Sequence, residues 1–145
     1  MLPNLSKLAK LYLEDRAQRP LLIEMSALGG DYGQSSEAKN RDGICEIAIS
    51  GILTASERWW GTSYGDIQER IQAAIDDPNC KGIALVIDSP GGDTDGCPEC
   101  ASFIASAAKK RPVWAICDVN AYSAACWLAS AASKVYAAPE SGGIG

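Results

Sequence analysis

The sequence predicts an α/β domain with a mostly parallel sheet. Strand-like and helix-like segments alternate from residue 44 onward, in the order β-α-β-α-β-α-β. Two of the strand segments, 83–87 and 113–117, are unbroken apolar runs, as expected of parallel strands that are covered on both faces. The helical segments between them place apolar residues on one side. In a sheet of this class, ligands bind where the carboxyl ends of the strands lead into loops.

The first 43 residues are predicted to form a short helix and a flexible link. Residues 5–17 carry four leucines among polar residues, which favours an amphipathic helix. Residues 29–43 are polar and contain glycine, which is typical of a linker. We therefore divide the chain into an N-terminal segment, 1–43, and a core domain, 44–145.

The core domain is expected to begin with a strand, a loop and a helix. The isoleucine-rich stretch 44–53 predicts the strand, and the polar stretch 54–62 predicts the loop. The adjacent Trp59-Trp60 pair in that loop is interpreted as packing or interface surface. Residues 63–66 have the spacing of a capping box, and isoleucines then recur every four residues, so a helix is expected to follow.

The second half of the domain repeats this alternation. After strand 83–87 comes Asp88–Gly96, DSPGGDTDG, which is predicted to be a loop because it holds a proline and two adjacent glycines. Asp95 is expected to cap the next helix, with Pro98 in its first turn. The remaining elements are expected to be a strand over 113–117, a helix over 123–133 and a strand over 135–138.

Composition and charge exclude several partners. Thirteen basic and eighteen acidic residues give a net charge of −5 without a basic run, so no nucleic-acid partner is expected. The apolar stretch 121–132 is too short to cross a bilayer, and residues 1–7 lack the pattern of a secretory signal. We therefore expect a cytoplasmic protein in which the six cysteines are buried thiols rather than disulfides.

The absence of histidine limits the chemistry. It excludes Ser-His-Asp and Cys-His catalysis and most zinc and iron sites, and we expect neither a metal nor a cofactor. Cys97 and Cys100 have the C-x-x-C spacing of a redox pair at a helix start, where a thiolate pKa would be lowered. The spacing does not sit where a thioredoxin-like motif would, and no second pair completes a zinc site, so coincidence is the favoured interpretation.

Two segments after predicted strands carry the candidate site. Gly91 and Gly92 leave their N–H groups bare of side chains, so these could point at an oxygen, with a plain turn as the alternative. Ser123 opens a predicted helix, either as an ordinary N-cap or as a nucleophile beside the N–H of Ala124. Each feature alone favours the structural interpretation. Their occurrence in order favours the functional one.

The two motifs stand in IALVIDSPGGDTDG and VWAICDVNAYSAACWLASAASKVYAAPESGGIG. In this order they resemble the signal peptide peptidase A (protease IV) family of serine peptidases. Within that family, residues 44–145 look most like the phage head maturation proteases of the lambda protein C type. The resemblance implies a Clp-protease/crotonase-like fold of repeated β-β-α and β-α units, here truncated at the C-terminus.

The resemblance also implies a site and a Ser-Lys mechanism. Ser123 matches the nucleophile, and the N–H groups of Gly92, with Gly91, and of Ala124 match the oxyanion hole. A buried neutral lysine would accept the Ser123 proton, an acyl-enzyme would form, and water would release it. An extended protein or peptide substrate would pair along the segment after the glycines, which comprises Asp93, Thr94, Asp95 and Gly96.

The general-base lysine is where the sequence departs from the family. Lys134 lies beyond the Ser123 helix, Lys81 precedes its strand, and Lys109 and Lys110 close another helix, so none is expected to reach Ser123. The family lysine lies further along or on another domain. The chain, ending at Gly145, is therefore expected to be a fragment or a prematurely ended copy that is inactive or crippled by itself.

The implied setting is phage head assembly. The resemblance implies a homo-oligomer, encoded by a phage or prophage, that cleaves capsid or scaffold proteins in the host cytoplasm or in association with the virion. Two alternatives are kept. A crotonase-type acyl-CoA enzyme would share the fold and the oxyanion hole without needing a nucleophilic serine. A non-enzymatic capsid assembly protein would use surfaces such as the Trp59-Trp60 pair.

Overall fold

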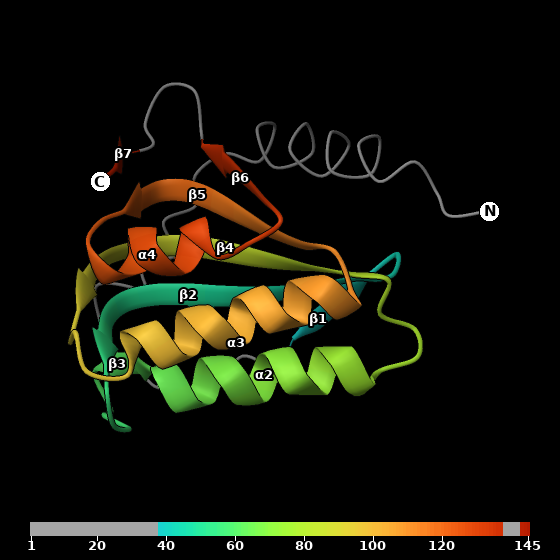
Figure 1. Ribbon diagram of the computed structural model, residues 1–145, viewed down its shortest axis with the longest axis horizontal. Coiled ribbons are helices and arrows are strands. Elements are labelled where there is room, and N and C mark those ends of the chain that lie inside the picture. Colours follow the sequence, from blue (N-terminus) through green and yellow to red (C-terminus); the bar gives the residue numbers. More distant parts are fainter. Residues whose placement is uncertain (1–37, 138–142) are drawn as a thin grey trace. The chain divides into compact units, whose positions relative to one another are not determined.

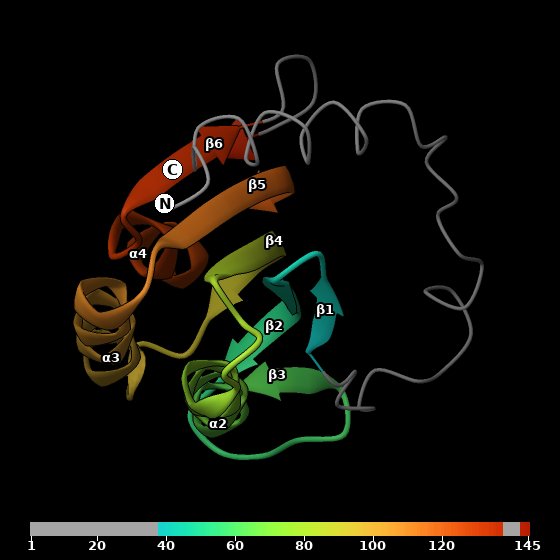
Figure 2. The same ribbon diagram turned by 90° about the vertical axis from the view of Figure 1, so that its right-hand side faces the viewer.

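In the described part of the chain, three helices lie on one face of a seven-stranded, mostly parallel sheet (Figures 1 and 2). The computed structural model describes residues 38–137 and 143–145. The predicted α/β class is confirmed, whereas the helix expected over residues 5–17 lies outside the described residues. The elements are β1 (Lys39–Arg41), β2 (Ile44–Thr54), β3 (Gly61–Ser63), α2 (Tyr64–Asp76), β4 (Gly82–Gly92), α3 (Cys97–Lys110), β5 (Val113–Ala121), α4 (Ala124–Ser130), β6 (Lys134–Ala137) and β7 (Gly143–Ile144).

The central strands of the sheet run in the same direction. The strand order is β1-β2-β4-β5-β6, with β3 beside β2 and β7 beside β5. β2 and β4 pair in parallel without a shift from Ile44↔Gly82 to Ser50↔Asp88, and β5 and β6 continue in parallel. Among the described strands, β1 alone is antiparallel to its neighbour. The carboxyl ends of β2, β4 and β5 therefore meet at one edge.

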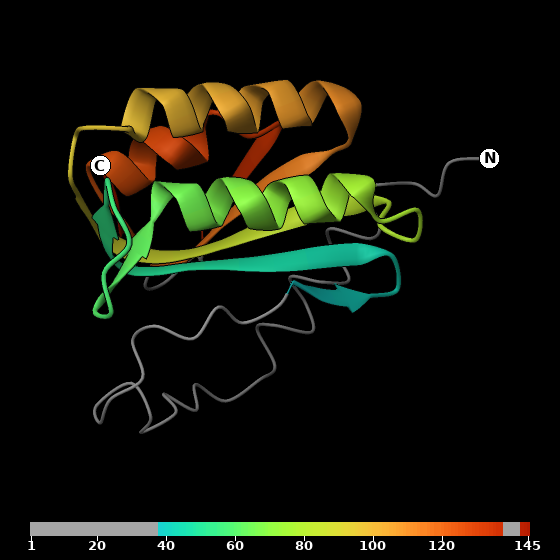
Figure 3. The same ribbon diagram turned by 90° about the horizontal axis from the view of Figure 1, so that it is seen from below.

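The core lies between the sheet and the helices. α2 and α3 run side by side across the sheet (Figure 3), and α3 lies between α2 and α4 (Figure 2). Because the packed core is dense, it holds the strand ends in fixed positions. The largest fully buried side chains are Ile47, Ile49, Leu53, Ile67, Ile71, Ile83, Leu85, Ile87, Ile104, Leu128 and Val113, with Thr54.

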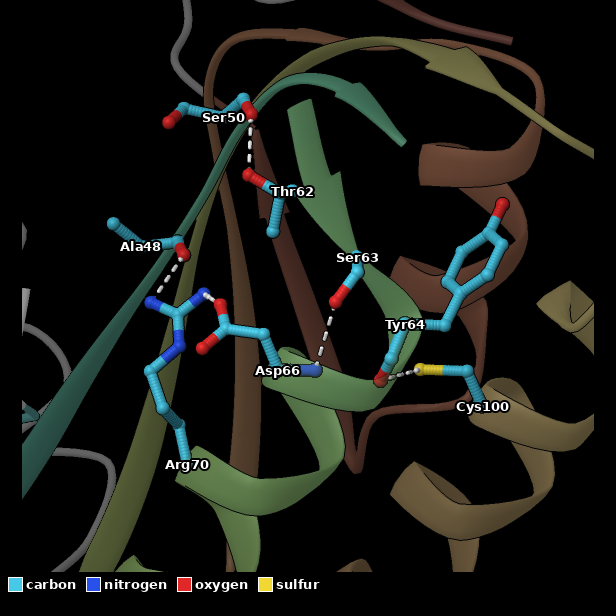
Figure 4. Close-up of polar contacts among 8 residues, drawn as sticks. All are labelled: Ala48, Ser50, Thr62, Ser63, Tyr64, Asp66, Arg70 and Cys100. Atoms are coloured by element: carbon cyan, nitrogen blue, oxygen red, sulfur yellow. Dashed lines mark hydrogen bonds and ion pairs between the residues drawn. The ribbon is translucent and has the colours of Figure 1, made fainter. Parts of the chain in front are cut away.

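α2 begins where the sequence predicts a helix. Ser63 is the N-cap, and its hydroxyl accepts a hydrogen bond of 3.1 Å from the Asp66 N–H (Figure 4). Arg70 donates to the Asp66 carboxylate at 2.6 Å and to the Ala48 carbonyl at 3.0 Å. The capping box is thus confirmed in its first half, and Arg70 ties the helix to β2.

The segment Asp88–Gly96 was predicted to be a loop, but its first part is a strand. β4 continues to Gly92 and pairs with the end of β2. This pairing is possible because the β2–β4 register shifts between Ser50 and Ile52, which lets the strands resume contact after an irregular stretch. Pro90 lies in that stretch, where its missing N–H is tolerated.

The start of α3 also differs from the prediction. Its N-cap is Gly96, at φ 83°, and no side chain caps it by a hydrogen bond, so the expectation that Asp95 caps the helix is wrong. Glycine adopts this left-handed conformation without steric cost. Pro98 lies in the first turn, as predicted.

Three short strands were not predicted from the sequence. β1 lies within the expected link and turns into β2 through Asp42 and Gly43, at φ 52° and 89°, the positive-φ pattern of a tight hairpin. β3 lies in the expected loop after β2, where the Thr62 hydroxyl donates to the Ser50 carbonyl at 2.7 Å (Figure 4). β7 pairs with the end of β5. Within the described residues, we find no helix of the length and hydropathy needed for a bilayer span.

Candidate active site

The two sequence motifs meet at the carboxyl edge of the sheet. β4 and β5 are neighbours, and they end at Gly92 and Ala121. The Tyr122 N–H donates to the Ser89 carbonyl at 3.1 Å, which links the turn after β5 to β4. The structure therefore brings the glycine pair and the Ser123 turn together, as expected for segments that follow adjacent parallel strands.

Gly91 packs directly against the Ser123 turn. A Cβ atom placed on Gly91 would lie 2.8 Å from Ser123 Cβ, 2.8 Å from the Tyr122 carbonyl oxygen and 3.2 Å from the Ala124 nitrogen. Gly91 also has φ 99°. Space and conformation both require glycine here, because any side chain would push the Ser123 turn away.

Gly92 is packed against β2 and open on its other side. A Cβ atom on Gly92 would lie 1.9 Å from the Leu53 carbonyl oxygen, and the Asp93 N–H donates to that same oxygen at 2.8 Å. Because successive N–H groups along a strand point to opposite sides, the Gly92 N–H points away from β2. The last β4–β5 pair is Ser89↔Ala121, so β5 does not cover this amide.

Ser123 has a strained backbone and an exposed side chain. Its φ and ψ are 53° and −122°, and within the described residues the other non-glycine residue at positive φ is Asp42. Ser123 stands at the N-cap position of α4, yet its side chain makes no capping hydrogen bond. The ordinary N-cap interpretation therefore does not fit. Such strain costs on the order of 1–3 kcal/mol and is concentrated at functional sites.

The amide groups around Ser123 differ in their availability. The Gly91 N–H donates to the Ser89 hydroxyl at 3.1 Å and is therefore engaged. Ala124 is the first residue of α4, and the N–H of a first helical residue has no partner inside the helix. Of the three expected donors, Gly92 and Ala124 are thus the pair that can serve an oxygen held beside Ser123.

The segment Asp93–Gly96 forms a largely exposed turn rather than an extended strand. The Asp93 carboxylate accepts a hydrogen bond of 3.0 Å from the Ala55 N–H, and the Asp93 carbonyl accepts one from the Tyr64 hydroxyl. Burial raises the pKa of Tyr64, so the phenol keeps its proton and remains a donor. These contacts fix the turn to α2 and to the chain after β2. Pairing of a substrate with Asp93, Thr94, Asp95 and Gly96 stays a prediction.

β7 is a neighbour of Ser123 that the sequence did not reveal. The Ser123 N–H donates to the Gly145 carbonyl at 2.5 Å, and the Gly145 N–H donates to the Ala121 carbonyl at 3.2 Å. A strand as short as Gly143–Ile144 has no recognisable alternation. Its position depends on pairing with β5, which a local pattern cannot predict.

The lysines in the described residues lie away from Ser123. Lys39 and Lys134 pair with residues near the amino ends of β2 and β5, and Lys81 precedes β4. Lys109 and Lys110 end α3, which starts at the carboxyl edge of the sheet and so finishes at the opposite edge. No lysine of residues 38–137 and 143–145 is therefore placed to take a proton from Ser123.

The C-x-x-C motif belongs to the core. Cys97 and Cys100 are fully buried. The Cys97 thiol donates to the Ala124 carbonyl at 3.7 Å, and the Cys100 thiol donates to the Tyr64 carbonyl at 4.0 Å; Figure 4 shows the second contact. Burial raises the pKa of both thiols, that of Cys100 to about 12, which is the reverse of a reactive redox pair. The described residues also contain no cluster of three or more side chains suited to a metal ion.

Comparison with solved structures shows a Clp-protease/crotonase-like fold. An enoyl-CoA hydratase from Polaromonas sp. JS666 matches 71% of this chain and 48% of its own, with a TM-score of 0.56 and 16% identity. A membrane-bound stomatin-specific protease, solved with a substrate peptide, matches 70% of this chain and 43% of its own, with a TM-score of 0.56 and 24% identity. These likenesses show the fold, which acyl-CoA enzymes and proteases share.

Two phage proteins are similar to this chain in sequence. Capsid assembly protease C of Escherichia phage lambda is 38% identical over 116 residues, which are 74% of this chain and 26% of the relative. Head-tail preconnector protein GP5 of Enterobacteria phage P21 is 42% identical over 100 residues, which are 64% of this chain and 20% of the relative. No established family profile matches the chain. The chain resembles the phage head maturation proteases over 74% of its own length, whereas the matched part spans only 26% of the lambda relative.

Proposed function

We propose that this domain supplies the nucleophile and the oxyanion hole of a serine peptidase that cleaves capsid or scaffold proteins during phage head assembly. The observation that carries the proposal is the contact between Gly91 and the strained Ser123, whose hydroxyl does not cap α4. The names of the two phage relatives, a capsid assembly protease and a head-tail preconnector, support the substrate class.

In this mechanism the Ser123 hydroxyl oxygen attacks the scissile carbonyl of the substrate. The negative charge that develops on the carbonyl oxygen is stabilised by the N–H groups of Gly92 and Ala124, which are preorganised donors. The amine of the downstream segment leaves with a proton, and an acyl-enzyme remains on Ser123. Water then releases the acyl group and restores the hydroxyl.

The general base in this proposal is a lysine from outside the described residues. A lysine that is removed from water has a lowered pKa and can accept the serine proton while neutral. The choice of lysine follows the resemblance to the Ser-Lys peptidase family. We further propose a homo-oligomer that acts in the host cytoplasm, with the peptide substrate held along Asp93–Gly96.

Selective labelling by a fluorophosphonate tests the proposal. Even without its base, a serine peptidase site still reacts roughly 10³-fold faster than the reaction in water, because the oxyanion hole and substrate binding remain. Ser123 should therefore be labelled well above Ser130, an exposed serine on the same helix whose hydroxyl donates to the Trp127 carbonyl at 2.7 Å. A small amine added as an exogenous base should accelerate labelling at Ser123 alone. Ser123→Ala should abolish the signal, and Ser130→Ala should leave it unchanged.

Equal labelling of Ser123 and Ser130, measured by peptide mass spectrometry with and without the amine, would contradict the proposal. If CoA thioesters then bound equally well to the wild type and to Ser123→Ala, the acyl-CoA interpretation would replace it. A chain that neither reacts nor binds thioesters would leave the non-enzymatic assembly role, for which the exposed Trp59 side chain is the available surface.

A further inference from the structure

Ser89 is a fully buried polar residue that the proposed mechanism does not use. Its hydroxyl donates to the Gly51 carbonyl at 2.7 Å and accepts from the Gly91 N–H at 3.1 Å. Its own carbonyl accepts from the Tyr122 N–H at 3.1 Å. One residue therefore joins by hydrogen bonds the end of β2, Gly91 in the glycine pair at the end of β4, and the residue that precedes Ser123.

These hydrogen bonds lie where the sheet is irregular. The β2–β4 register shifts between Ser50 and Ile52, and the β4–β5 register shifts between Ile87 and Ser89. At such shifts backbone groups lose their regular ladder partners. A hydroxyl can donate and accept at once, so one serine can replace partners on both sides.

The two backbone groups that bond to the Ser89 hydroxyl belong to glycines. Gly51 and Gly91 have φ 70° and 99°, and glycine has no side chain to restrict its backbone. The Ser89 hydroxyl fixes the direction of the Gly91 N–H, which belongs to the Pro90–Gly91 peptide, directly before the peptide that carries the Gly92 N–H. In a buried site such bonds are strong, and losing one partner leaves the other unsatisfied.

We propose that Ser89 is a positioning residue that aligns the Gly92 N–H with Ser123. The catalytic part of this inference rests on the proposed function. The structural part, that the Ser89 hydroxyl orders the Gly91-Gly92 pair, does not depend on the proposed function.

The experiment compares Ser89→Ala with Thr54→Val in the full chain. Thr54 is an apt control because its hydroxyl is also buried, yet the structure shows no hydrogen-bond partner for it. Three quantities are measured for each variant: the urea unfolding midpoint, the exchange rate of the Gly91 amide hydrogen, and fluorophosphonate labelling of Ser123 as a function of reagent concentration.

Ser89→Ala should speed exchange of the Gly91 amide hydrogen. It should also lower the saturating labelling rate by about tenfold or more, because a small misplacement of a reacting group costs up to about 10²-fold in rate. The reagent concentration at half-saturation should not change. Ser89→Thr, which keeps the hydroxyl, should restore much of the rate. Thr54→Val should change neither exchange nor labelling. A purely structural role would move the unfolding midpoint without this split between rate and affinity.

Wild-type rates of exchange and labelling in a folded Ser89→Ala chain would overturn the inference. If that variant fails to fold, Ser89→Cys, a weaker hydrogen-bonding group of similar size, decides the question by the same two readouts. If the wild type is not labelled at all, the proposed function fails. Amide exchange then still shows whether Ser89 orders the Gly91-Gly92 pair.

Discussion

The two ends of the central strands are built in different ways. At the amino ends, β2 and β4 pair without a shift over a long run, from Ile44↔Gly82 to Ser50↔Asp88. At the carboxyl ends, both neighbouring strand pairs shift register. The residues with positive φ at that edge are Gly51, Gly91, Gly96 and Ser123. The regular half is a scaffold, and the irregular half carries the candidate site.

The strained backbone lies where the surrounding structure supports it. A backbone such as that of Ser123 persists only when the surrounding structure over-determines it. Here three features supply that support: the buried aliphatic side chains of the core, the Ser89 hydrogen bonds and the contact with Gly91. Changes at the carboxyl edge should therefore affect chemistry and stability differently, whereas changes in the scaffold should affect stability alone.

The largest effect is expected from Gly92→Ala. The added Cβ atom would lie 1.9 Å from the Leu53 carbonyl oxygen, so the strands must separate, and we expect a loss of more than about 4 kcal/mol in the free energy of unfolding. Gly65→Ala in α2 is the matched control, because its Cβ atom would meet only Ser63 Oγ at 3.9 Å. That control should be neutral or stabilising by up to about 1 kcal/mol in urea unfolding. Equal stability of both variants would contradict the β2–β4 pairing at the site.

Alkaline pH should weaken the fold. Burial raises the pKa of Cys45 and of Cys100 to about 12, from the usual 9.0. The unfolded chain therefore releases these protons at lower pH than the folded chain. The stability that the protonated thiols contribute is complete below pH 9 and is lost as the pH rises toward 12.

Urea unfolding at a series of pH values checks this expectation. The unfolding free energy should depend less on pH above 9 in Cys100→Ala than in the wild type. An identical pH dependence in both chains would show that this thiol is not held protonated by the fold.

Ser123→Gly should separate stability from reactivity. Glycine relieves the strain at φ 53°, so the free energy of unfolding should rise by about 1–2 kcal/mol. The same variant should lose all fluorophosphonate labelling at this position. Ser130→Gly, at the end of α4, should instead lose up to about 1 kcal/mol and keep its labelling. A destabilised Ser123→Gly would mean that the hydroxyl contributes to the fold after all.

The smallest effect is expected at the α2 cap. Ser63→Ala removes the hydrogen bond to the Asp66 N–H and should cost about 1 kcal/mol in thermal or urea unfolding. Labelling of Ser123 should not change, because the lost hydrogen bond lies within the first turn of α2 and involves neither β4 nor the Ser123 turn. A large loss of labelling at unchanged stability would show that the α2 cap and the candidate site are coupled.

The sequence predicted the scaffold better than the site. Unbroken apolar runs identified β4 and β5, and a capping box identified α2, because these signals are local. The extension of β4 to Gly92 was missed because it depends on pairing with β2 across a register shift. Ser89 was not singled out, since its partner Gly51 is 38 positions away. The Asp42-Gly43 turn carried a local hairpin signal that could have revealed β1.

The crystal structure of the fluorophosphonate-treated chain would show whether Ser123, Gly92 and Ala124 form one reactive site. We expect a phosphonyl group on Ser123 Oγ, with its oxygen about 2.7–3.1 Å from the backbone nitrogens of both Gly92 and Ala124. An adduct on another residue, or a phosphonyl oxygen directed into solvent away from these two amides, would mean that the three residues do not form such a site.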